Sequence, residues 1–190
     1  MITQNPSVLV LSGTCGSGKS TIAGLVATRA GWCRVSEDDI WPRHFGKDRG
    51  AFGTAEHRQK RGVVHGEVLE RVRAARRDGL NVVIDATIHE ARPEALREYR
   101  AMFSHAGIDW HLCVLHPRVD VAIARDAGRG YGSVGAVQVA ALHSKFTGRV
   151  IPAECFLDTS AEPPEVTVER VLKKLANRPL QPTRRTTPRG

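Results

Sequence analysis

The chain has 190 residues, a length that suits one domain with a full core. Its hydrophobic content of 41% and charged content of 25% are ordinary for a soluble globular protein, and its apolar runs are far shorter than the roughly 20 residues of a membrane-spanning helix. These features exclude a membrane protein, and the net charge of +8 suits an anionic ligand. The N-terminus shows no signal-peptide pattern, so we expect a cytoplasmic location and no membrane partner.

Short apolar runs alternate along the chain with segments of helical periodicity. The apolar runs predict strands over residues 7–12, 33–36, 81–85, 110–115 and 154–159. The periodic segments predict helices over residues 19–31, 54–78, 92–107, 118–127, 133–146 and 164–177. This alternation indicates an α/β fold, with a parallel sheet, right-handed crossovers and helices on both faces. Ligands of such sheets bind beyond the carboxyl ends of the strands.

The loop after the first predicted strand has the sequence GTCGSGKST, over residues 13–21. Its spacing, Gly13-x-x-x-x-Gly18-Lys19-Ser20, matches the phosphate-binding loop pattern in full, and a helix follows it. Glycines allow backbone N–H groups to surround a phosphate at a helix N-terminus, while Lys19 reaches the β- and γ-phosphates and Ser20 binds Mg²⁺. We therefore expect ATP and Mg²⁺ as cofactors, with the nucleotide bound by Gly13, Thr14, Cys15, Gly16, Ser17, Gly18, Lys19, Ser20 and Thr21.

Three acidic residues follow the second predicted strand, in the sequence SEDDIW over residues 36–41. Two adjacent aspartates project in different directions, so only one of them can face the γ-phosphate. A carboxylate there can accept a proton from a hydroxyl group during phosphoryl transfer, or help to hold the metal. We favour Asp38 as this base and keep Asp39 as a substrate contact. The alternative is that Ser36 or Asp38 caps a short helix.

Asp85 ends the third predicted strand, after the apolar sequence NVVI. An acid in this position is typical of the aspartate that orients Mg²⁺ through water, and Thr87 adds a hydroxyl group near the substrate. The alternative is that Asp85 only starts a turn.

Arg125 and Arg129 lie four residues apart before a glycine-rich stretch, in the sequence RDAGRGYG. Two guanidinium groups one helical turn apart can clamp transferring phosphates, and the glycines permit the hinge of a closing lid, over about residues 125–135. The alternative is a solvated, charged helix end.

The segment just after the acidic residues, WPRHFGK over residues 41–47, combines aromatic, basic and glycine residues. It follows the expected base directly, where an acceptor molecule has to lie. We therefore expect Trp41 and Arg43 to contact the acceptor.

Positive charge is concentrated at the C-terminal end. Residues 178–190 contain four arginines and no acidic residue, which accounts for half of the net charge of +8. The segment is rich in proline and threonine and has no apolar periodicity. We predict one domain over residues 1–177 and a basic, disordered tail over residues 178–190.

With these motifs in this order, residues 7–176 resemble the P-loop kinases, and within them the group of polynucleotide 5′-hydroxyl kinases, zeta toxins and chloramphenicol phosphotransferase. The resemblance implies a three-layer P-loop NTPase fold, with a five-stranded parallel sheet and a small arginine-bearing lid. It also implies ATP-dependent phosphorylation of a hydroxyl group. Lys19 and Ser20 match the family's phosphate and Mg²⁺ contacts, Asp38 its general base, and Arg125 and Arg129 its lid arginines.

The acceptor is where the chain departs from the polynucleotide kinases. Those enzymes carry R-D-D-Y-R at this point, and the last arginine grips the acceptor's phosphate, whereas this chain has Trp41 there. Arg43 partly substitutes for that arginine. We therefore expect a small-molecule acceptor such as a metabolite, sugar or antibiotic. The alternatives are a polynucleotide 5′-hydroxyl kinase, and a nucleotide-dependent switch that is not a kinase.

Overall fold

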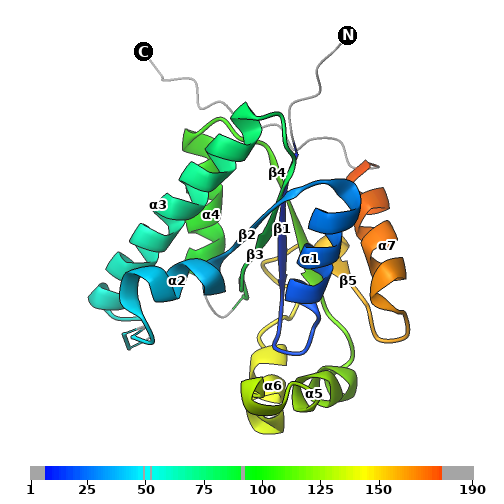
Figure 1. Ribbon diagram of the computed structural model, residues 1–190. Coiled ribbons are helices and arrows are strands. Elements are labelled where there is room, and N and C mark those ends of the chain that lie inside the picture. The colour runs from blue at the N-terminus through cyan, green and yellow to red at the C-terminus, as the bar shows by residue number, and fades with distance from the viewer. Residues whose placement is uncertain (1–6, 49, 52, 91–92, 177–190) are drawn as a thin grey trace.

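The computed structural model describes residues 7–48, 50–51, 53–90 and 93–176. Its centre is a five-stranded parallel sheet in the order β2-β3-β1-β4-β5 (Figure 1). The strands are β1 (Val8–Gly13), β2 (Cys33–Ser36), β3 (Val82–Asp85), β4 (Trp110–Leu115) and β5 (Phe156–Leu157). The α/β class and the five-stranded parallel sheet predicted from the sequence are confirmed. The predicted tail, residues 178–190, lies outside the described residues.

Helices cover both faces of the sheet. They are α1 (Lys19–Ala30), α2 (Glu37–Phe45), α3 (Ala55–Arg77), α4 (Pro93–His105), α5 (Val119–Ala127), α6 (Ala136–His143) and α7 (Pro164–Ala176), with short 3₁₀ turns η1 (Gly130–Gly132) and η2 (Ala153–Cys155). The helices α1 and α7 lie on one face, and α3 and α4 lie on the other (Figure 1). The helices α5 and α6 lie together beyond the end of β1 where the phosphate loop begins (Figure 1).

The apolar runs of the sequence are continuous because each strand is buried on both faces. In β1, Val8 and Val10 pack into the core under α3 and α4, whereas Leu9 and Leu11 pack into the core under α1 and α7. All four side chains are fully buried. This two-sided core fixes the register of β1 between β3 and β4, and so fixes where the loop after β1 emerges.

Two of the elements that differ from the sequence-based expectation are α2 and β5. The helix α2 was expected only as an alternative, and it does form, with the Ser36 hydroxyl accepting a hydrogen bond from the Asp39 N–H as its N-cap. The strand β5 has only two residues, Phe156 and Leu157, because the preceding residues form the η2 turn.

The carboxyl ends of β1, β2 and β3 lead into the phosphate loop, the first turn of α2 and Asp85. All three features therefore gather at one edge of the sheet, as expected for a parallel α/β fold. In the part of the chain that the structure describes, no helix is both long and apolar enough to cross a membrane.

Candidate active site

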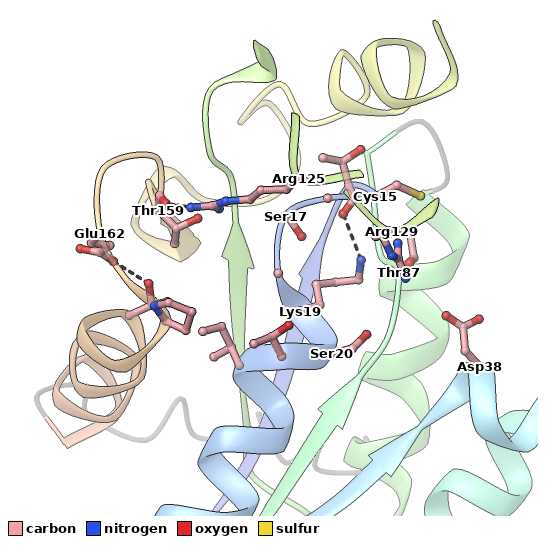
Figure 2. Close-up of a pocket in the computed structure, with 17 residues that line it drawn as sticks. Cys15, Ser17, Lys19, Ser20, Asp38, Thr87, Arg125, Arg129, Thr159 and Glu162 are labelled. Carbon is pink, nitrogen blue, oxygen red and sulfur yellow. Dashed lines mark hydrogen bonds between the residues drawn. The ribbon is translucent and has the colours of Figure 1, made fainter. Parts of the chain in front are cut away.

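A cavity of about 400 Å³ opens at this edge of the sheet (Figure 2). Its walls come from the phosphate loop, α1, α2, the loop after β3, the lid and the chain that enters α7. The lining residues are Thr14, Cys15, Gly16, Ser17, Gly18, Lys19, Ser20, Thr21, Ile22, Asp38, Thr87, Arg125, Arg129, Thr159, Glu162, Pro164 and Thr167. The structure thus brings most of the residues predicted from the motifs into one cavity.

Glycines shape the backbone of the phosphate loop. Gly13, Gly16 and Gly18 all have positive φ angles, of 146°, 73° and 92°. A Cβ atom on Gly16 would lie 2.0 Å from the carbonyl oxygen of Ala122 in α5, so only glycine fits this approach. The loop leads directly into the N-terminus of α1, where free backbone N–H groups favour an anion.

Lys19 lies at the base of the loop, and its Nζ donates a hydrogen bond to the Thr14 carbonyl oxygen at 3.1 Å. Burial lowers the pKa of Lys19, and the negative charges of Asp85 and Asp38 partly oppose this effect. The buried hydroxyl of Ser17 has no hydrogen-bond partner among the described residues. A phosphate group in the loop would give the ammonium group a counter-charge and would supply acceptors for these donors, so the loop fits a nucleoside phosphate.

Ser20 lines the cavity one residue after Lys19. Asp85 is not among the lining residues: it is a buried carboxylate with 4% exposure at the end of β3, and its negative charge opposes the lowering of the Lys19 pKa. Arg34 in β2 lies 3.4 Å from Asp85 Oδ2. The described residues contain no group of three His, Cys, Asp or Glu side chains that could hold a metal ion. Mg²⁺ commonly takes one or two protein ligands, with phosphate oxygens and waters completing its shell, so Ser20 and Asp85 fit Mg²⁺ held together with a nucleotide.

The three consecutive acids at the start of α2 point to three different surroundings. Glu37 Oε1 accepts a hydrogen bond from the Tyr99 hydroxyl at 2.6 Å, inside the protein. Asp39 is 56% exposed and lies 3.4 Å from Arg34. Asp38 lines the cavity, and Figure 2 shows its carboxylate across from Lys19 and Ser20. Of the two aspartates, only Asp38 shares the cavity with the phosphate loop.

The two lid arginines both line the cavity but diverge. Arg125 extends toward Thr159 and donates a hydrogen bond to its carbonyl oxygen at 2.8 Å, whereas Arg129 lies on the other side, near Lys19 and Thr87 (Figure 2). They therefore do not form a single clamp in this structure, because α5 ends at Ala127 and Arg129 follows the helix.

In the segment predicted to form a lid, one carboxylate holds the loop over residues 133–135 in place. Asp126 is 1% exposed and accepts hydrogen bonds from the Ser133 hydroxyl at 2.7 Å, the Val134 N–H at 2.9 Å and the Gly135 N–H at 3.2 Å. Burial alone would raise the pKa of Asp126, but these hydrogen bonds keep it below its usual value. The predicted helix over residues 133–146 begins only at Ala136, since these contacts hold residues 133–135 as a loop.

Three of the four expected acceptor contacts lie outside the cavity: Asp39, described above, Trp41 and Arg43. Trp41 is 5% exposed, stacks on His57 and donates its indole N–H to the Asp48 carbonyl oxygen at 3.3 Å, so it is part of the core beneath α2. Arg43 is 55% exposed and lies 3.7 Å from Glu67. Neither residue lines the cavity, whereas Thr87 does.

Sequence reasoning missed the wall of the cavity that lies beside α7. Thr159 follows β5, and Glu162 accepts a hydrogen bond from the Thr167 hydroxyl at 2.9 Å. The Thr159 hydroxyl is buried and makes no hydrogen bond within the described ranges. The rule that ligands collect at the carboxyl ends of strands points to Thr159, but nothing in the local sequence distinguishes Glu162 or Thr167.

Residues 8–148 match the family described as AAA domain. The chain belongs to this family. No curated protein matches the chain. Among solved structures, the fold is similar to that of a sugar kinase from a Janibacter species, with a TM-score of 0.65, 24% identity and coverage of 91% of this chain and 95% of that one.

Two further solved structures share the fold. A gluconokinase from Sinorhizobium meliloti has a TM-score of 0.63 and 22% identity, with 91% of this chain and 93% of that chain covered. The tunicamycin resistance protein of Deinococcus radiodurans has a TM-score of 0.68 and 18% identity, with 90% and 96% covered. The family match and these folds confirm the resemblance to P-loop kinases drawn from the sequence.

Proposed function

We propose that the protein is an ATP-dependent phosphotransferase that moves the γ-phosphoryl group to a hydroxyl group of a small molecule. The observation that carries this proposal is the position of Asp38. Its carboxylate lies in the same cavity as Lys19 and Ser20, and comes from a different strand end. A nucleotide switch needs the phosphate loop and Mg²⁺, but it does not need a carboxylate base placed for an acceptor hydroxyl.

Each residue has a distinct task in this reaction. The bound ATP with Mg²⁺ supplies the phosphoryl group and the leaving ADP. Asp38 accepts the proton of the acceptor's hydroxyl as its oxygen bonds to phosphorus, and Lys19 and Arg129 stabilise the charge on the transferring group. Thr87 lines the same side of the cavity and donates or accepts a hydrogen bond to the acceptor. Most of the rate enhancement then comes from positioning and electrostatics.

The arm of the cavity along α1 and α7 suits the nucleoside. It is lined by Thr21, Ile22 and Pro164, with the buried hydroxyl of Thr159 beside them. An apolar wall with a few polar groups is the usual surface for a heterocyclic base. Arg125, which is held to Thr159, would then lie on the nucleotide side, and Arg129 on the acceptor side.

The acceptor side supports a small molecule over a polynucleotide. The cavity volume of about 400 Å³ lies within the range of small-molecule sites. The position of the polynucleotide kinases' phosphate-gripping arginine is taken by Trp41, which is buried in the core. The similar structures include a sugar kinase and a gluconokinase.

A panel of acceptors tests the proposal. ATP consumption by the full chain with Mg²⁺ is measured with sugars, gluconate, shikimate, nucleosides, aminoglycoside and phenicol antibiotics and a 5′-hydroxyl oligonucleotide. We expect turnover only with a small hydroxyl compound, and a product heavier by one phosphoryl group in mass spectrometry. Turnover only with the oligonucleotide would favour the polynucleotide kinase, and ATP hydrolysis that no acceptor stimulates would favour the switch.

A further inference from the structure

The first turn of α2 is held by contacts that the reaction described above does not use. Glu37 directly precedes Asp38, and its side chain is only 22% exposed. Its Oε1 accepts a hydrogen bond from the Tyr99 hydroxyl at 2.6 Å and lies 3.2 Å from His65 Nε2. A glutamate at a helix start is ordinarily solvated, so this inward orientation calls for an explanation.

The partners of Glu37 come from two helices far away in the sequence. His65 is in the middle of α3, and Tyr99 is in the middle of α4. The Tyr99 side chain is 1% exposed, and its ring packs edge-on against His65 at a centroid distance of 5.0 Å. Burial, and then the nearby carboxylate of Glu37, raise the pKa of Tyr99 well above its usual value. Tyr99 is therefore always a donor to Glu37 at neutral pH.

Charged side chains continue this line of contacts beyond His65, although His65 and Glu98 do not form a hydrogen bond. Glu98 Oε2 lies 3.6 Å from His65 Nδ1, and Arg61 donates to Glu98 Oε1 at 2.6 Å. Arg61 and Glu98, at the far end of this line of contacts, thus belong to the same two helices, α3 and α4. These helices pack on the sheet through the core that includes Val68, Tyr99 and Phe103, so the chain of contacts has a rigid base.

We propose that Tyr99 and His65 are positioning residues, which hold Glu37 and thereby aim the neighbouring Asp38 at the acceptor hydroxyl. This inference rests on the proposed role of Asp38 as the base. One peptide bond separates Glu37 from Asp38, so a rotation of the first turn that releases Glu37 also turns Asp38. A displacement of about 1 Å at a reacting group can cost about a hundredfold in rate.

A role of Glu37 through its negative charge alone predicts a different result from a role as an anchor of the first turn. If Glu37 acted only by its negative charge, near Asp38, then neutralising it would change the reaction even where its hydrogen bonds stay. If Glu37 acts as an anchor, a glutamine in its place keeps a carbonyl oxygen that accepts the Tyr99 hydroxyl, and the rate is kept. The two expectations separate at Glu37→Gln.

The test compares four variants by kcat and KM with the best acceptor of the panel. Tyr99→Phe keeps the ring in the core and removes only its hydroxyl, and Glu37→Ala removes the anchor from the other side. We expect each of these two variants to lower kcat by about ten- to a hundredfold, with KM for ATP within about twofold of the wild type. The kcat of Glu37→Gln should stay within about threefold of the wild type. Val72→Ala is the control, because it loosens the same core two helical turns along α3 from His65, and we expect it to lower Tm but to leave kcat within about twofold.

The double variant Tyr99→Phe/Glu37→Ala adds a second criterion. Both changes cut the same hydrogen bond, so the double variant should be no slower than the slower single variant. The inference is overturned if Tyr99→Phe and Glu37→Ala both keep wild-type kcat, if Val72→Ala lowers kcat as much, or if Glu37→Gln is as slow as Glu37→Ala.

Hydrogen exchange gives a readout that needs no acceptor. We expect the peptide that spans α2 to exchange at least about tenfold faster in Tyr99→Phe, while α3 is unchanged. Unchanged exchange in α2 would refute the anchor. If Asp38→Asn transfers phosphoryl groups at the wild-type rate, or the wild type transfers none, the proposed function fails, and the exchange measurement still decides whether Tyr99 holds α2.

Discussion

The phosphate loop and the first turn of α2 face the same cavity, but different kinds of contact hold them in place. The loop is shaped by its own glycines, by the strand before it and by the helix after it. The first turn of α2 has its own Ser36 cap, but its acids are oriented by Arg34 in β2, His65 in α3 and Tyr99 in α4. The shape of the loop is therefore set mainly by nearby residues, with one close tertiary approach, that of Gly16 to the Ala122 carbonyl oxygen in α5, whereas the orientation of the acids of α2 depends on tertiary contacts.

Under the proposed function, this difference separates the part of the site that binds phosphate from the part that selects and activates the acceptor. A locally determined loop keeps the nucleotide in a constant position at the end of β1. A turn that depends on distant helices can be re-aimed by substitutions in those helices while the phosphate loop stays the same. Proteins of this fold can thereby keep one cofactor site and act on different acceptors.

The largest expected effect is at Lys19, at the end of the phosphate loop. Lys19→Ala removes the ammonium group from the phosphates, so we expect phosphoryl transfer to fall by at least about a thousandfold. Steady-state kinetics measures this loss, with Lys173→Ala, an exposed site on α7, as the matched control. Turnover of Lys19→Ala near the wild-type rate would contradict the assignment of the loop.

The backbone of the loop gives the next effect. Gly16→Ala places a Cβ 2.0 Å from the Ala122 carbonyl oxygen at a φ of 73°, so we expect ATP binding to be lost and stability to fall by about 2 kcal/mol. Gly24→Ala, on α1 with nothing within 4 Å of the added Cβ, should raise stability by about 0.5–1 kcal/mol. Calorimetric titration with ATP and denaturant unfolding check both. Equal behaviour of the two variants would show that the loop tolerates side chains.

A smaller effect concerns the tertiary contact between Glu90 and residues 147–151. Glu90 accepts hydrogen bonds from Thr147, Val150 and Ile151. Burial alone would raise the pKa of Glu90, but these hydrogen bonds lower it to about 2 from an ordinary 4.5. The stability from this contact is therefore complete above about pH 4.5 and is lost as the pH falls toward 2.

We expect Glu90→Gln to lower stability at pH 7 by about 1 kcal/mol, since solvent screens this group, and to flatten the pH dependence below 4.5. Urea unfolding between pH 2.5 and pH 7 measures both quantities, with the exposed Glu154→Gln as the control. If the two variants have the same pH dependence as the wild type, Glu90 does not stabilise the loop over residues 147–151.

The contrast between the phosphate loop and α2 also shows which parts of the structure the sequence predicts. The phosphate loop, four of the five strands and the placement of Asp38, Thr87, Arg125 and Arg129 in one cavity follow from spacing and periodicity. The direction of Arg125 toward Thr159 does not follow, because it depends on where β5 lies beside β4.

Other parts of the site depend on partners that no local pattern reveals. The burial of Trp41 depends on His57 in α3, and the inward turn of Glu37 depends on Tyr99 in α4. An aromatic residue beside an acidic pair favours a ligand contact when only the sequence is read, and only the packing of α2 on α3 shows that it belongs to the core.

The most direct test of the account compares Asp38→Asn with Asp39→Asn, two adjacent and isosteric changes. Single-turnover phosphoryl transfer to the acceptor found in the panel is measured together with ATP affinity. We expect Asp38→Asn to bind ATP normally and to lose transfer by several orders of magnitude, and Asp39→Asn to stay within about threefold of the wild type. Full transfer by Asp38→Asn, or a greater loss in Asp39→Asn, would contradict the assignment of Asp38 as the base.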